Sequence, residues 1–148
     1  MTEKRLLIKK RKDPFLLFSD WYQEAIHKEL NDPNAMNLST LSKDFKPSSR
    51  IVLLKDYDKS GFVFYTNLKS KKGISINKNP NVALNFHWKS CLRQVRIEGK
   101  AKKISDLESD KVEKKINKAE KAYKEELKKA RSELENSMKD LDSIKAEL

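Results

Sequence analysis

The sequence contains one cysteine, two histidines and three glycines, and it has no long apolar run. The single cysteine, Cys91, excludes an intramolecular disulfide and any cysteine-based zinc site. His27 and His87 stand far apart in the chain, so no histidine-based metal site is expected. No run of about eighteen apolar residues is present, so no membrane-spanning helix is expected.

A secretory signal is also not expected. Residues 1–12 are basic, but their apolar stretch covers only Leu6 to Ile8, and no small-residue cleavage site follows. We therefore expect a soluble cytoplasmic protein. A chain of 148 residues is long enough for one domain with a real core and an appendage.

The net charge of +11 at pH 7 is the largest compositional bias. Residues 1–107 contain 22 Lys+Arg against 11 Asp+Glu, whereas residues 108–148 contain 11 of each. The excess charge in the first part favours anionic partners, from phosphorylated metabolites to nucleic acid. A lysine-rich surface that only confers solubility is the simpler interpretation, and nucleic acid is not expected as a partner.

The first 30 residues predict a basic arm followed by a helix. Residues 1–12 carry six cations and little to bury, which indicates a mobile arm. Asp13-Pro14 has the residues of a helix start, with Asp as the N-cap and Pro at the first helical position. Helical spacing then predicts an amphipathic helix from about Pro14 to Leu30. Its core-facing residues are expected to be Phe15, Phe18, Trp21, Tyr22, Ala25, Ile26 and Leu30.

Between Ala35 and Ile104 the pattern is that of β structure. A turn from Asp56 to Gly61 joins two strands in the strongest hairpin of the chain. One short helix, from Ser70 as N-cap to Asn79, interrupts the strands, although its glycine weakens it. Five or six strands with short antiparallel connections predict a small closed or partly open barrel. The expected strands cover residues 35–42, 51–54, 62–66, 82–88 and 92–104.

From Leu107 onward the sequence predicts a single long helix, because no Gly or Pro interrupts it. Its apolar positions are spaced 4, 3, 4, 4, 3, 4, 4 and 3 residues apart, which is an eleven-residue repeat. The stripe must pack on the barrel, pack on a second copy, or stay exposed. Its members are Val112, Ile116, Ala119, Tyr123, Leu127, Ala130, Leu134, Met138 and Leu141.

Residues 48–72 are the best candidate for a binding site. Arg50 and Lys55 bracket one predicted strand, and Lys71 and Lys72 follow the next one at the start of a helix. Cations at a helix N-terminus suit a phosphate group, so a phosphorylated cofactor is the first ligand to test. Arg50 and Lys55 are five residues apart and should face opposite sides of a regular strand. Either a bulge intervenes, or one of the two side chains reaches the ligand from the strand end.

Several segments together resemble a known family. DPFLLFSDWYQEAI, NDPNAMNLSTL, PSSRIVLLKDYDKSGFVFYTNLKSKKG, NPNVALNFHW and RQVRIEGKAKKIS resemble, in order and spacing, the N-terminal half of the pyridoxamine 5'-phosphate oxidases. The match covers about residues 13–106. The resemblance implies an FMN-binding split β-barrel, mainly β with flanking helices, that forms a homodimer with FMN at the interface.

The resemblance also implies an activity and a set of site residues. The reaction is oxidation of pyridoxamine or pyridoxine 5'-phosphate to pyridoxal 5'-phosphate, with dioxygen as the acceptor, in vitamin B6 metabolism. The small partner is then a phosphorylated B6 vitamer, whose phosphate Lys55 is expected to meet. No catalytic residue and no metal ligand are assigned. The residues expected to bind FMN are Arg50, Ile51, Val52, Leu53, Leu54, Lys55, Tyr65, Thr66, Lys71, Lys72 and Gln94.

The sequence departs from the family beyond the match. Family members carry a substrate-binding Tyr, Arg and Ser there, followed by a second half, whereas residues 110–129 read DKVEKKINKAEKAYKEELKK. Two functions therefore stay open: an FMN-dependent oxidoreductase, or a non-catalytic FMN-binding or interaction module whose C-terminal helix serves assembly. The expected parts are the arm (1–12), the barrel (13–106) and the charged helix (107–148). His87, Cys91, Trp21 and Trp88 are interpreted as structural or surface residues.

Overall fold

The computed structural model describes residue 8 and residues 11–146, with side chains up to residue 139. Most of the arm predicted for residues 1–12 lies outside these described residues. The chain divides into two compact units, residues 1–103 and residues 104–148.

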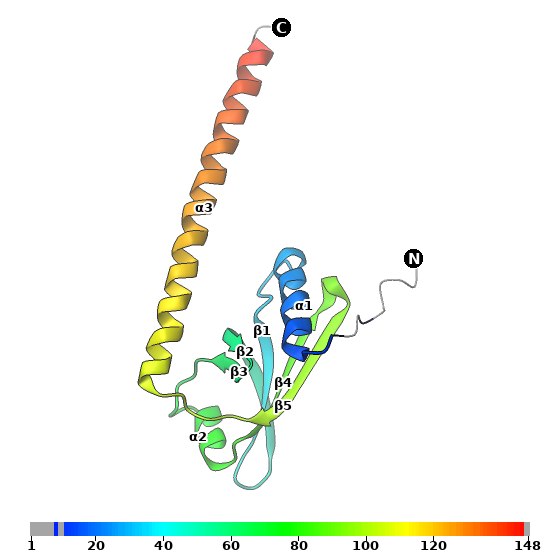
Figure 1. The fold of residues 1–148 in the computed structure, drawn as a ribbon, viewed down its shortest axis with the longest axis vertical. Coiled ribbons are helices and arrows are strands. Elements are labelled where there is room, and N and C mark those ends of the chain that lie inside the picture. The colour runs from blue at the N-terminus through cyan, green and yellow to red at the C-terminus, as the bar shows by residue number, and fades with distance from the viewer. Residues whose placement is uncertain (1–7, 9–10, 147–148) are drawn as a thin grey trace. The chain divides into compact units, whose positions relative to one another are not determined.

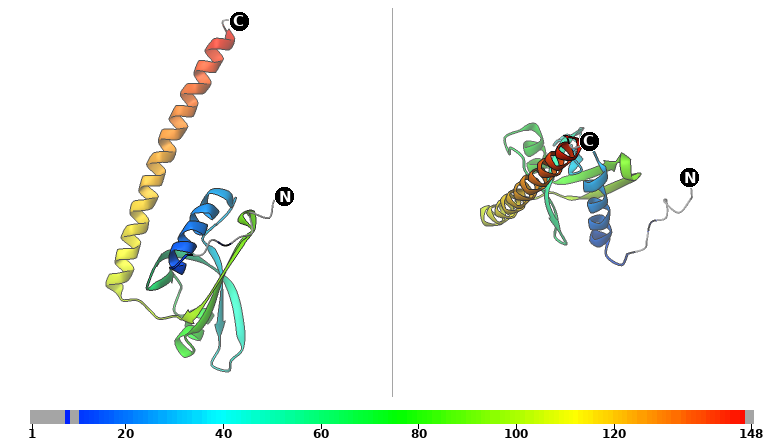
Figure 2. Two further views of the ribbon diagram at one scale, coloured as in Figure 1. Left: turned by 45° about the vertical axis from the view of Figure 1, so that its right-hand side comes forward. Right: turned by 90° about the horizontal axis from the view of Figure 1, so that it is seen from above.

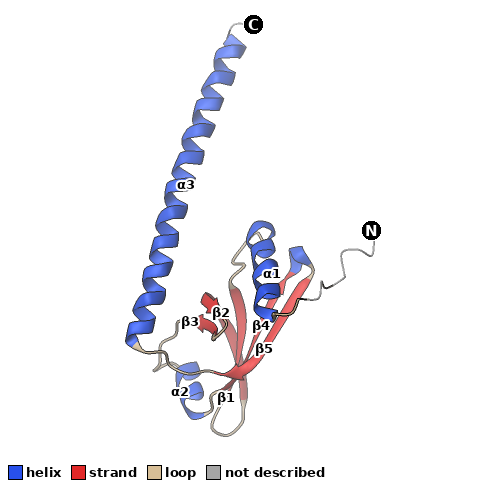
Figure 3. Cartoon of the chain, viewed as in Figure 1, coloured by secondary structure: helices blue, strands red, loops and turns tan. Residues whose placement is uncertain are grey.

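The first unit is a curled antiparallel sheet with helices beside it (Figures 1 and 2). Five strands are hydrogen-bonded in the order β3-β2-β1-β4-β5. This confirms the predicted mainly β fold with flanking helices, and of the predicted closed or partly open barrel the structure shows the partly open form (Figure 3). The elements of this unit are α1 (Pro14–Lys28), β1 (Ala35–Leu41), β2 (Pro47–Asp58), β3 (Gly61–Phe64), α2 (Lys71–Lys78), β4 (Asn81–Trp88), the 3-10 turn η2 (Lys89–Cys91) and β5 (Arg93–Lys100).

Helix α1 begins as the sequence predicts but ends earlier. The Asp13 carboxylate accepts a hydrogen bond from the Phe15 backbone N–H at 2.9 Å, and Pro14 occupies the first turn. The helix stops at Lys28, because Glu29 is already extended. Leu30 therefore lies beyond the helix with 94% of its surface exposed, and its predicted place on the core-facing side is wrong.

The core lies between α1 and one face of the sheet, which we call the inner face. The Phe18 ring contacts five other aromatic rings, two of them on β4. Burying such an aromatic side chain stabilises the fold by about 1.5–3 kcal/mol. The Trp88 indole N–H also donates to the Pro33 carbonyl at 2.7 Å, which ties β4 to the loop before β1. The rings around Phe18 belong to Tyr22, Tyr57, Phe62, Phe86 and Trp88.

Several strand limits differ from prediction, and β2 begins at Pro47 rather than at residue 51. β2 continues to Asp58, so the hairpin loop is only Lys59-Ser60 and the predicted turn from Asp56 was too wide. Gly61, which follows this loop, has φ +146°, a conformation that side chains other than hydrogen rarely allow. β3 ends at Phe64 rather than residue 66, and β5 ends at Lys100 rather than residue 104.

The second unit is the helix α3 (Asp106–Ala146), the long C-terminal helix that the sequence predicts. Ser105 precedes it and exchanges hydrogen bonds with Glu108, which is a capping box at the N-terminus. Most apolar stripe residues on its described part are exposed, Tyr123 and Leu134 by 65% and 62%. No helix in the described part of the chain is long and apolar enough to cross a membrane.

Candidate functional site

One edge of β2 is open along the predicted binding stretch. β1 pairs with β2 from Pro47 to Leu53, but β3 pairs with it only from Leu54 onward. Among the described strands, none pairs with residues 47–53 on the β3 side. Backbone N–H and C=O groups on this edge are therefore available to a ligand.

A β-bulge at Lys55 separates the two halves of β2. Leu54 pairs with Phe64, but the next paired residue is Asp56, opposite Val63. Lys55 is thus the extra, unpaired residue, and the bulge returns Tyr57 to the inner face. The five-residue spacing of Arg50 and Lys55 was expected to require either a bulge or a side chain that reaches the ligand from the strand end. The structure shows a bulge.

Side chains of β2 alternate between the two faces of the sheet. Val52 and Leu54 are buried in the core, so only their backbone atoms can meet a ligand. Ile51 and Leu53 lie on the opposite, outer face, where 64% and 40% of their surfaces are exposed. Val52 and Leu54, two of the six residues of this strand that are predicted to bind FMN, therefore also pack in the core.

Arg50 is held in place by neutral partners. Its guanidinium donates to the Leu38 carbonyl at 3.1 Å, the Thr40 hydroxyl at 2.8 Å and the Ser48 hydroxyl at 2.7 Å. These contacts use three of its five N–H groups, and no carboxylate of the described chain pairs with it. An oriented guanidinium with donors to spare suits an anionic group.

Thr66 lies two residues beyond the end of β3. The last residue of this strand, Phe64, pairs with Leu54, where the unpaired edge of β2 begins. The Thr66 hydroxyl oxygen is buried and has no hydrogen-bond partner among the described residues. Buried hydroxyls are nearly always satisfied, so this one points to a ligand group.

Helix α2 begins a few residues after Thr66 and presents two lysines in its first turn. The Ser70 hydroxyl accepts from the Gly73 N–H at 3.3 Å, as the sequence predicts for the N-cap. Lys71 is exposed and Lys72 half-buried, and neither forms an ion pair with a described residue. Cationic side chains and the free N–H groups of a first turn together favour a phosphate.

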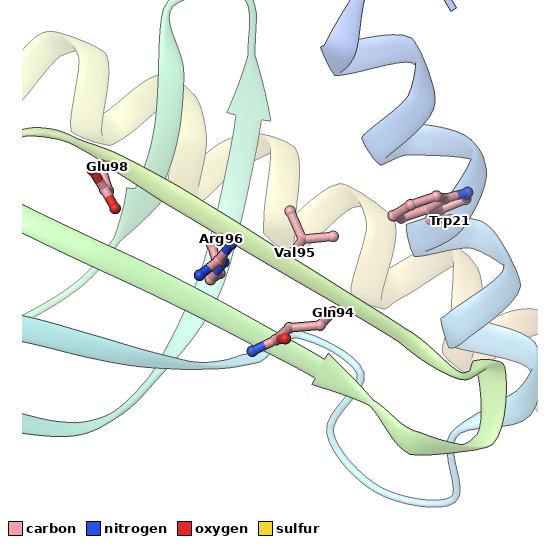
Figure 4. Close-up of a pocket in the computed structure, with 5 residues that line it drawn as sticks. All are labelled: Trp21, Gln94, Val95, Arg96 and Glu98. Carbon is pink, nitrogen blue, oxygen red and sulfur yellow. The ribbon is translucent and has the colours of Figure 1, made fainter. Parts of the chain in front are cut away.

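Gln94 lies on a different edge of the sheet. It sits on β5, separated from β2 by β1 and β4, and its side-chain amide donates to the Asn85 amide oxygen at 3.0 Å. A shallow groove follows this edge, and Gln94 and Val95 project to opposite sides of β5 (Figure 4). Within one chain, the structure does not bring Gln94 to the residues around α2. The groove is lined by Trp21, Gln94, Val95, Arg96 and Glu98.

The remaining chemically interesting residues offer no second site. His87 is exposed on β4. Cys91 is buried, and burial raises the pKa of its thiol, so it is a poor nucleophile. No group of three or more potential metal ligands occurs among the described residues.

Sequence reasoning missed the residues that position Arg50. Thr40 and Ser48 face each other in the register of β1 and β2, and both hydroxyls contact the guanidinium. Ser48 lies two residues from Arg50 in the chain, which is a detectable signal. Nothing local to Thr40 indicates this role, because the register of the two strands creates it.

Comparison with known proteins gives consistent matches. The family model described as pyridoxamine 5'-phosphate oxidase matches residues 22–146. A pyridoxine/pyridoxamine 5'-phosphate oxidase of Caulobacter vibrioides is 56% identical over 98 residues, which are 66% of this chain and 44% of that protein. The corresponding protein of Wolbachia pipientis wMel is 54% identical over 100 residues, 68% of this chain and 46% of that protein. The chain thus spans about half the length of these relatives.

Two solved structures share the fold. PhzG from Burkholderia lata 383, solved with tetrahydrophenazine-1-carboxylic acid, superposes with a TM-score of 0.66 at 24% identity, covering 76% of this chain and 55% of PhzG. A pyridoxamine 5'-phosphate oxidase-related, FMN-binding protein from Nostoc punctiforme gives a TM-score of 0.50 at 18% identity, covering 56% and 46%. At these identities the likeness concerns the fold alone.

Proposed function

Because the chain belongs to the pyridoxamine 5'-phosphate oxidase family, we propose that residues 13–106 bind FMN and serve the oxidation of pyridoxamine or pyridoxine 5'-phosphate. The observation that carries the proposal is the buried hydroxyl of Thr66, which has no partner among the described residues and lies two residues beyond the end of β3. It stands at a position where the family resemblance expects a flavin contact.

The residues present fit the phosphate of FMN. Lys71 and Lys72 supply two positive charges at the start of α2, and Arg50 supplies a third that is already oriented by Thr40 and Ser48. A dianionic phosphate among three cations gains charge-assisted hydrogen bonds, which are about twice as strong as neutral ones. Lys71 stands where the family commonly has Arg, so charge is kept but a bidentate contact is lost.

Bound FMN would supply the redox chemistry by accepting a hydride and passing electrons to dioxygen. The role of this chain is to bind FMN and the substrate and to orient them. The open edge of β2 offers backbone groups to a flat ring, and the Thr66 hydroxyl offers a hydrogen bond. Lys55, set apart by the bulge, is the residue we assign to the substrate phosphate.

A second copy of the chain is part of this proposal. Gln94 lies across the sheet from the residues around α2, so one chain does not gather all eleven predicted FMN contacts. The outer face carries exposed Ile51 and Leu53, together with an Asn37 amide oxygen that is buried without a partner. An apolar surface with an unsatisfied amide suits a homodimer interface.

The test is the flavin content and activity of the purified chain. We expect a yellow protein that releases FMN on denaturation and produces hydrogen peroxide with pyridoxamine 5'-phosphate. The double variant Lys71→Ala/Lys72→Ala should bind FMN at least about tenfold more weakly than the wild type. The matched control is Lys69→Ala, which should bind FMN as the wild type does. A colourless protein that takes up no added FMN contradicts the proposal.

The same experiment separates the proposed oxidase from a flavin-binding module without activity. The chain spans about half the length of its relatives, and the family's further substrate contacts lie in the part it does not match. FMN binding without peroxide production would indicate the module. A dimer that binds FMN and turns over substrate would establish the oxidase.

A further inference from the structure

The apolar stripe of α3 is an exposed surface of regular shape. Its members repeat every eleven residues, which corresponds to 3.67 residues per turn and keeps the stripe nearly parallel to the helix axis. Tyr123, Leu127, Leu134 and Met138 are 65%, 40%, 62% and 56% exposed. Such a continuous apolar surface is costly in water and is typical of an interaction site. The third member of each repeat is small in its first two occurrences, Ala119 and Ala130, which lets another helix approach closely.

Charged residues border the stripe in a definite order. At 3.67 residues per turn, each residue turns the helix by about 98°. Lys115 and Glu126 therefore border the stripe on one side, and Glu120 and Arg131 border it on the other. Between residues 115 and 131, the first side changes from cation to anion and the second from anion to cation.

We propose that α3 pairs with the α3 of a second copy of this chain, parallel and in register. In a parallel helix pair, a bordering residue faces the residue five positions further along on the opposite border of the partner. Lys115 then faces Glu120 of the second copy, and Glu126 faces Arg131 of the second copy. The two-fold symmetry repeats both contacts. All four resulting pairs join opposite charges.

An antiparallel pair has poorer charge complementarity. Aligning the two stripes head to tail centres the pair on Leu127, and equivalent borders then face each other. Glu120 still meets Arg131, but Glu126 meets Glu126 of the second copy. Two attractive contacts and one repulsive contact replace four attractive ones. The charge order therefore selects the parallel arrangement.

Disulfide formation in the full-length chain tests the orientation. In a Cys91→Ser background, Met138→Cys places one thiol within the stripe, and Asn136→Cys places it on the opposite side of the same turn. A parallel, in-register pair brings the two thiols at position 138 together, so mild oxidation should yield a covalent dimer. The thiol at position 136 should react at least about fivefold more slowly. Equal rates at both positions, or no crosslink at position 138, would overturn the proposal.

A charge-swap cycle tests the pairing itself. In the Met138→Cys chain, Glu126→Lys sets like charges against Arg131, and Arg131→Glu sets like charges against Glu126. Since symmetry doubles each contact, each single change should slow crosslinking about fivefold, while the double change should restore it. An antiparallel pair would not recover, because position 126 would still meet itself. Far-ultraviolet circular dichroism of every variant checks that α3 is retained.

The proposed helix pair does not depend on flavin binding, because the apolar stripe of α3 begins at Val112, outside residues 13–106. Crosslinking at position 138 in a protein that binds no FMN would support the helix pair and refute the proposed function. An FMN-bound dimer that does not crosslink there would do the reverse.

Discussion

The Thr66 hydroxyl oxygen is buried without a hydrogen-bond partner among the described residues. Leaving a buried polar group unpaired costs about 1–3 kcal/mol. We propose that bound FMN completes this hydrogen bond, so Thr66 is the residue at which the proposed site can be tested most directly.

We expect Thr66→Val to raise the Kd for FMN about tenfold without lowering stability. Valine has the shape of threonine and removes only the hydroxyl, so the unliganded protein should unfold at the same or a slightly higher urea concentration. Thr40→Val is the matched control for stability, because its hydroxyl accepts from Arg50 at 2.8 Å and its loss should destabilise the fold. Urea unfolding and flavin fluorescence titration measure the two effects. Unchanged FMN affinity in Thr66→Val would remove Thr66 from the site.

Tyr22 predicts a loss of stability at alkaline pH. Burial, followed by the neighbouring Tyr57, raises the pKa of its phenol above 10.0. A pKa that is higher in the folded state favours the protonated form on folding, so this contribution is complete at neutral pH and is lost above about pH 10. We expect the free energy of unfolding to fall less between about pH 9 and 11 in Tyr22→Phe than in the wild type. Parallel curves for the two proteins would contradict this.

Helix α2 illustrates an element whose existence the sequence predicts and whose packing it does not. Gly73 weakens the helical pattern of residues 70–79, yet the helix forms. A Cβ atom at this position would lie 2.5 Å from the Leu68 carbonyl oxygen and 2.7 Å from the Asn67 carbonyl oxygen. Glycine is therefore required because the first turn of α2 lies close to residues 67 and 68, which connect Thr66 to this helix.

We expect Gly73→Ala to destabilise the protein by about 1–3 kcal/mol, because backbone atoms must move to admit the methyl group. Alanine is the better helix former, so a gain of stability would be expected from propensity alone. Gly99→Ala is the control, since no atom lies within 4 Å of the added Cβ there. Urea midpoints that rise in Gly73→Ala would show that the close approach is unimportant.

The bulge in β2 is likewise predictable from the sequence only in part. Arg50 and Lys55 are five residues apart, so a regular strand cannot direct both side chains to the same face. An irregularity in the strand was therefore predictable. Its position was not, because it depends on Leu54 and Asp56 pairing with consecutive residues of β3. Pairing between strands is a tertiary property, even in a hairpin.

At the scale of the whole molecule, we propose that the outer face of the sheet meets a second copy of the chain at the FMN site. Ile51 and Leu53 are exposed there, and Gln94 lies across the sheet from α2. If a second copy covers this face, the two proposals concern one assembly: the barrels share flavin sites and the helices pair.

We expect Ile51→Glu to shift the protein from dimer towards monomer and to lower its FMN content. The carboxylate would be buried without a partner in the interface, which costs several kcal/mol. Leu16→Glu is the matched control, because Leu16 is a comparably exposed apolar residue on α1, 55% exposed. Sedimentation velocity and flavin absorbance measure both properties. A variant that remains dimeric with full flavin content would place the interface elsewhere.

The sequence by itself determined the local elements: the capped helix at Asp13, the hairpin, the short helix after Ser70 and the uninterrupted stripe of α3. These follow from residue preferences and spacings within a short stretch of the chain. The sequence also placed the cations of the candidate site next to those elements.

Only the tertiary structure decided which of those residues meet. Strand register sets Arg50 against Thr40, strand order separates Gln94 from α2, and the path beyond β3 buries the Thr66 hydroxyl. Each of these depends on how separate strands and segments pack together, so no pattern within a single element encodes it. The early end of α1, which exposes Leu30, was missed for a similar reason, because periodicity does not record where the backbone must turn towards the sheet.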